Sequence, residues 1–77
     1  MDRSAGELRD LRVALGLRQD FVAMVVLGYA SGNRLHDYET GRRAMPEAHR
    51  RRLARYLAKI QRAHVAALPL GEGEAAS

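Results

Sequence analysis

Hydrophobic residues recur at helical spacing in the first part of the chain. Leu8, Leu11 and Leu15 stand at i, i+3 and i+7, so a helix would bring them to one side. Before them, Ser4 and Glu7 have the spacing of a capping box, in which each side chain bonds to the other residue's backbone amide. These patterns predict a first helix that starts after Ser4.

A continuous apolar run follows at Phe21–Leu27. Its periodicity fits a buried strand as well as a buried helix, so spacing alone does not decide between them. The neighbouring helical patterns favour a second helix, from about Gln19 to Leu27. Gly28 to Ala30 is then expected to form a turn.

A third helix is predicted after this turn. Ser31 is suited to cap its N-terminus, and Leu35 and Tyr38 fall on one side of it. Gly16 and Gly41 are placed to end the first and third helices, because glycine accepts the positive φ of a helix C-terminus without a Cβ clash.

The last helix is predicted to begin near Pro46, and Glu47 would complement the positive end of its dipole. It carries an apolar stripe with heptad-like spacing: Leu53, Leu57, Ile60, His64 and Ala67. We expect this stripe to form a dimer interface, and the apolar surplus of Phe21–Leu27 is a second candidate for that surface. Pro69 and Gly71 should end the helix.

Length and composition narrow the class of protein. The 77 residues predict one domain at 1–70 and a disordered acidic tail at 71–77. There is no cysteine, which excludes a disulfide framework and a thiolate metal site. The longest apolar run is far shorter than the ~20 residues of a membrane span, and Asp2 lies where a secretory signal is basic. We therefore expect a cytoplasmic chain without membrane contact.

Basic residues outnumber acidic ones by 13 to 9, and most of them lie between Arg34 and Arg62. Such a concentration suits a polyanionic partner. The alternative is a solvated, arginine-rich helix from a GC-rich genome, since Lys59 is the only lysine.

Two motifs decide between these interpretations. The first is Leu11-Arg12 followed by Gly16-Leu17-Arg18-Gln19, and the second is Tyr38-Glu39-Thr40-Gly41-Arg42-Arg43-Ala44-Met45-Pro46. Together with Val22-Ala23 and Ser31, they resemble the phage-repressor/Cro-type helix-turn-helix DNA-binding domains, over roughly Leu8 to Leu57. The resemblance implies an all-α fold of four to five helices. Between Gln19 and Tyr38 the chain is about two residues longer than the family pattern, and we expect the excess within Val26 to Ala30.

The resemblance implies that the helix after Ser31 is a recognition helix that enters the major groove of DNA. By position, four residues would face the bases: Gly32, Asn33, Arg34 and Asp37. Asn33 is suited to adenine, and Arg34 to guanine or a phosphate. Gly32 only permits close approach, whereas Asp37 would accept from cytosine or hold Arg34 in place.

The resemblance also implies contacts to DNA phosphates, which set the register of the protein without reading sequence. The expected residues are Gln19, Ser31, His36, Arg42 and Arg43, with Arg50–Arg52 as an extension. Arg12 and Glu39 match a pair that joins the first helix to the end of the third in this family, so both are expected to form a structural salt bridge.

Catalysis finds no support in the sequence. His36, His49 and His64 lack ligand spacing and no glycine-rich phosphate loop is evident, so no enzymatic activity, cofactor or metal is expected. The predicted function is a transcriptional regulator, a repressor that binds a palindromic operator in double-stranded DNA as a homodimer. The alternative is an antitoxin-like interaction module whose main partner is another protein.

Overall fold

The computed structural model describes residues 4–67, and the side chains of residues 4–64. The helices are α1 (Ala5–Ala14), α2 (Gln19–Phe21), the π-helical segment η1 (Val22–Val26), α3 (Asn33–Glu39) and α4 (Glu47–Ala67). No strand occurs within residues 4–67, so the predicted all-α class is confirmed, with four α-helices. The predicted tail at 71–77 lies outside the described residues.

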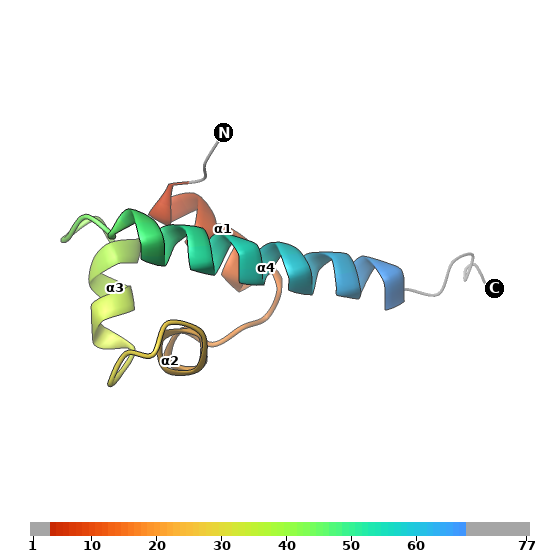
Figure 1. The fold of residues 1–77 in the computed structure, drawn as a ribbon, viewed down its shortest axis with the longest axis horizontal. Coiled ribbons are helices and arrows are strands. Elements are labelled where there is room, and N and C mark those ends of the chain that lie inside the picture. The colour runs from red at the N-terminus through yellow and green to blue at the C-terminus, as the bar shows by residue number, and fades with distance from the viewer. Residues whose placement is uncertain (1–3, 68–77) are drawn as a thin grey trace.

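The three short helices gather around the N-terminal half of α4, and its C-terminal half extends beyond them (Figure 1). Over the described residues, none of the helices is long and apolar enough to cross a membrane.

α1 forms as the sequence predicts. Its capping box is complete: Ser4 Oγ accepts from Glu7 N at 3.2 Å, and Glu7 Oε1 accepts from Ser4 N at 2.8 Å. Leu8 is fully buried on the inner side, and Leu11 packs against the core beside it. Gly16 ends the helix with a φ of 73°.

The second helix is not a regular α-helix. After a single α-helical turn, the chain widens into η1, where Leu27 N donates to Val22 O at 3.2 Å, five residues back. A π-turn contains one more residue than an α-turn. The helix therefore holds one more residue per turn within Val22–Val26 than a regular α-helix would.

α3 follows a turn that starts at Gly28, whose φ is 74°. Its N-cap residue is Gly32, one position after the predicted Ser31. The Oγ atom of Ser31 accepts a hydrogen bond from Asn33 N, the first residue of the helix, at 3.3 Å. Gly41 ends the helix with a φ of 83°, as predicted.

Gly32, the N-cap residue of α3, also lies close to the backbone of α2. A Cβ atom built at this position would lie 3.3 Å from the Cα atom of Asp20. Such a contact is tighter than ordinary van der Waals packing, so the absence of a side chain permits this spacing of the two helices.

The core contains side chains from α1, η1, α3 and α4, and from the turn between η1 and α3. Its buried hydrophobic members are Leu8, Val22, Ala23, Leu27, Tyr29, Leu35, Tyr38, Leu53 and Leu57.

This packing corrects the predicted dimer interface. Leu53 and Leu57 have 1% and 0% of their surface exposed, because they cover the core of their own chain. Further along α4, Ile60 is half-buried and His64 is exposed. The side chain of Ala67 lies outside those described.

Candidate nucleic-acid interface

α3 has a buried side and an exposed side. Leu35 and Tyr38 lie in the core, whereas Asn33, Arg34 and His36 are exposed. A short helix of this kind presents polar side chains to solvent while its other side holds it against the domain.

A buried ion pair fixes the orientation of α3. Arg12 Nε donates to Glu39 Oε2 at 2.8 Å, and Arg12 Nη2 donates to Glu39 Oε1 at 3.0 Å. Only 9% of the Arg12 side chain and 2% of the Glu39 side chain are exposed. Bidentate geometry of this kind is strong and directional. The salt bridge expected between these residues is present, and it joins α1 to the last residue of α3.

Two further hydrogen bonds extend this pair into a network. Gln19 Nε2 donates to Glu39 Oε1 at 2.9 Å, and Arg12 Nη1 donates to Leu17 O at 2.7 Å. Gln19, expected as a phosphate contact, therefore braces α3, and its amide is partly committed to the protein. The buried network links α1, α2 and α3, so the exposed side of α3 has a set direction.

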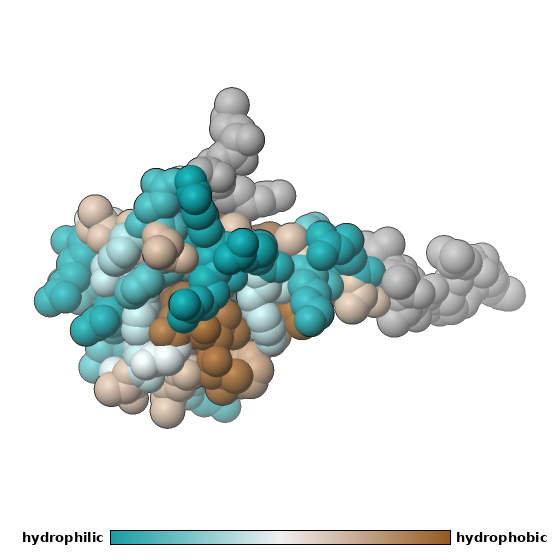
Figure 2. Space-filling model, in the orientation of Figure 1, coloured by the Kyte–Doolittle hydropathy of each residue, from teal (hydrophilic) through white to brown (hydrophobic). Residues whose placement is uncertain are grey.

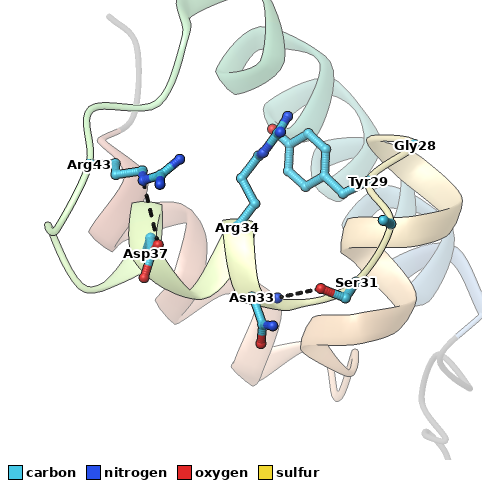
Figure 3. Close-up of a pocket in the computed structure, with 8 residues that line it drawn as sticks. Gly28, Tyr29, Ser31, Asn33, Arg34, Asp37 and Arg43 are labelled. Carbon is cyan, nitrogen blue, oxygen red and sulfur yellow. Dashed lines mark hydrogen bonds and ion pairs between the residues drawn. The ribbon is translucent and has the colours of Figure 1, made fainter.

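An open pocket lies beside α3, formed with the turn before it and with Arg43 (Figure 3). Its volume is about 370 Å³, and its lining comprises Gly28, Tyr29, Ala30, Ser31, Asn33, Arg34, Asp37 and Arg43. These residues include several of the predicted DNA contacts, which the fold thus brings together on one side of the domain.

Arg34 and Asn33 point in different directions within this region. The Arg34 guanidinium lies over the Tyr29 ring, with its Cζ atom 5.0 Å from the ring centroid. Figure 3 shows Arg34 turned toward Tyr29 and Asn33 turned away from it. A cation–π contact at this distance is favourable, so it restrains Arg34. The two predicted base-reading side chains therefore do not share one direction.

Asp37 has a different partner from the one expected. It does not hold Arg34; its Oδ2 atom lies 3.6 Å from Nε of Arg43. The chain after α3 folds back at this point, because the amides of Arg42 and Arg43 both donate to Asp37 O, at 2.8 and 3.2 Å. Asp37 thus offsets the charge of Arg43, whereas Arg42 is exposed and forms no ion pair within residues 4–64.

The arginines at the start of α4 are partly paired as well. Glu47 binds both Arg50, at 3.2 Å, and Arg51, at 2.8 Å. Arg52 is exposed and contributes a positive potential at Tyr29. The carboxylate of Glu47 therefore offsets part of the positive charge of the predicted extension of the phosphate-binding surface.

Tyr29 was not singled out from the sequence, where it appeared only as a turn residue. It is buried, its Oη atom lies 2.6 Å from Nδ1 of His49 in a hydrogen bond, and its ring meets that of Tyr38 edge-on at 6.1 Å. Burial raises the pKa of Tyr29 above its ordinary value of 10.0, and Tyr38 adds to this, while Arg34 and Arg52 oppose it. A large aromatic residue in a short connection flanked by Gly28 and Gly32 was the available signal.

Comparison with models of known protein families, with curated proteins and with solved structures gave no match. The function is therefore argued from the site itself.

Proposed function

We propose that this chain is a sequence-specific regulator of transcription, a repressor that binds double-stranded DNA through α3. The observation that carries the proposal is the exposed polar side of α3, held in a set direction by the buried network around Glu39 and flanked by Arg42 and Arg43. The helix-turn-helix is formed by the α2–η1 segment, the turn that follows it, and α3.

In this proposal α3 enters the major groove, which is ~12 Å wide and admits one helix. Asn33 is the base-reading residue, because it is exposed and its amide can bond an adenine edge through both an acceptor and a donor. Gly32 contributes no side chain, and its backbone lies close to α2.

The arginines near α3 are assigned to the DNA backbone. Arg34 is stacked on Tyr29 and turned away from Asn33, a position that suits a phosphate rather than the base that Asn33 reads. Arg42 has no carboxylate partner among the described side chains and offers its full charge, whereas Arg43 must first share Asp37. Contacts of this kind supply affinity and register.

Two copies are needed for a useful affinity. A single small domain buries too little DNA surface for the nanomolar binding typical of operators. A homodimer on inverted half-sites joins two recognition helices, so the operator is palindromic.

Selection of bound duplexes from a random DNA pool by the purified chain tests the proposal. We expect a consensus with inverted half-sites, and Asn33→Ala should relax one position in each half-site with a loss of ~1–3 kcal/mol on the selected sequence. If no sequence is enriched among the bound duplexes, the proposal is contradicted. The alternative, an antitoxin-like interaction module whose main partner is another protein, is then favoured. Equal losses for Asn33→Ala on selected and random DNA would refute the base-reading role.

A further inference from the structure

The outer side of the α2–η1 segment is apolar where a surface helix is ordinarily polar. Phe21, Met24 and Val25 stand at i, i+3 and i+4, and 41%, 51% and 67% of their surfaces are exposed. On the opposite side, Val22 and Ala23 are fully buried in the core. A helix that is apolar all round is normally covered on both sides. Figure 2 shows hydrophobic side chains gathered over this segment below α4, amid a largely hydrophilic surface.

These side chains line an open groove with a charged rim. The groove has a volume of about 340 Å³ and is lined by Arg18, Asp20, Phe21, Met24 and Val25. At its rim, Arg18 Nε and Nη2 donate to the two carboxylate oxygens of Asp20, both at 3.2 Å. The Arg18 side chain is 81% exposed, so this pair is free to exchange partners.

We propose that two copies of this chain associate through this groove, about a two-fold axis. A two-fold interface places the same surface against itself, so its rim must be complementary to itself. One cation and one anion meet this condition, because Arg18 of each copy can pair with Asp20 of the other.

The arginine-rich surface of the domain is not complementary to itself. The turn after α3 and the start of α4 are rich in arginine, and two such surfaces would repel one another. An acidic partner would be expected there, whereas the balanced rim of the groove fits a second copy.

The size of the patch determines how stable this dimer is. The three exposed side chains amount to roughly 300 Å² in each copy. With the rim included, the buried total is on the order of 1,000 Å², below the ~1,200–2,000 Å² of stable complexes. The dimer is therefore weak in free solution and forms efficiently when an operator holds two copies side by side. This last step rests on the proposed function; the interface itself does not.

Disulfide trapping tests the interface directly, because the chain has no cysteine of its own. Val25→Cys should form a covalent dimer under mild oxidation. The matched control is Val13→Cys on α1, which is 57% exposed and lies outside the groove; it should remain mainly monomeric. Equal cross-linking of the two variants would overturn the proposal.

A charge exchange tests the two-fold pairing. Arg18→Asp alone and Asp20→Arg alone should each sediment as monomers at concentrations where the unmodified chain associates. An equimolar mixture of the two should recover the dimer, because each copy then meets its opposite charge across the axis. Failure of the mixture to associate, or a strictly monomeric unmodified chain at high concentration, would refute the interface.

Binding to one half-site separates this inference from the proposed function. Val25→Glu should raise the dimer dissociation constant by at least about tenfold, while binding of a duplex with a single half-site stays unchanged. If dimerisation fails but half-site binding persists, only the interface is wrong. If the chain dimerises as described but selects no DNA, only the proposed function is wrong.

Discussion

Replacing Glu39 with leucine should remove a large part of the stability of the domain. The carboxylate accepts two hydrogen bonds from Arg12 and one from Gln19, at 2.8, 3.0 and 2.9 Å. In Glu39→Leu, the Arg12 guanidinium stays buried and keeps only its bond to Leu17 O. A buried charge deprived of its partner costs ~3–5 kcal/mol.

This cost is large for so small a domain. At ~0.05–0.15 kcal/mol per residue, a chain of this length has only ~4–12 kcal/mol of total stability. The melting temperature should therefore fall by at least ~12 °C, since each kcal/mol shifts it by ~4–8 °C in domains of this size. Urea unfolding followed by far-ultraviolet circular dichroism measures the free-energy change.

Two controls make the reasoning falsifiable. The double variant Arg12→Met, Glu39→Leu should recover much of the loss, because an apolar pair of similar volume leaves no stranded charge. Glu47→Gln removes a carboxylate that is 56% exposed, so it should cost no more than ~1 kcal/mol. A loss below ~1 kcal/mol for Glu39→Leu, or a double variant as unstable as the two single losses combined, would refute the coupling.

Three further outcomes are expected. Arg42→Ala should weaken binding to all duplexes and reduce the slope of log affinity against log salt by about one, whereas Arg9→Ala, an exposed arginine on α1, should leave the slope unchanged in a salt titration. Arg34→Ala should weaken binding to selected and random duplexes by the same factor, as measured by fluorescence anisotropy. A loss confined to the selected duplex would show that Arg34 contacts a base. Because the pKa of Tyr29 is raised, the unfolded chain loses this proton first, so the contribution of Tyr29 to stability is fully present below about pH 9 and is lost as the pH rises above 10. Tyr29→Phe should abolish that alkaline fall in urea titrations across pH, and a fall of equal size in this variant would exclude Tyr29 as its source.

Local signals were sufficient to predict α1 and the C-terminal end of α3. The capping box at Ser4 and Glu7 and the glycines at 16 and 41 act over three or four residues, so their effects can be read directly from the sequence. The identity of η1 could not be read in this way, because a continuous apolar run carries no periodicity to distinguish α from π.

Contacts between distant residues account for the remaining differences. The bond of Tyr29 to His49, 20 residues further along the chain, depends on how the turn before α3 meets α4, and no local pattern encodes this. The stripe on α4 shows the same difficulty. Leu53 and Leu57 have a spacing that suits a core and a dimer seam equally, and only the fold shows that the core of the same chain covers them.

The close approach of α2 at Gly32 limits how this surface can evolve. Any larger residue there would place its Cβ atom 3.3 Å from the backbone of Asp20, so one of the two helices would have to move. Asn33, next to it, is exposed and has no such neighbour. Descendants of this chain that acquire new targets should therefore diversify at position 33 while position 32 stays glycine. In a saturation library covering both positions, we expect many different residues at position 33 and a strong preference for glycine at position 32, with alanine next because it needs only a small shift of α2.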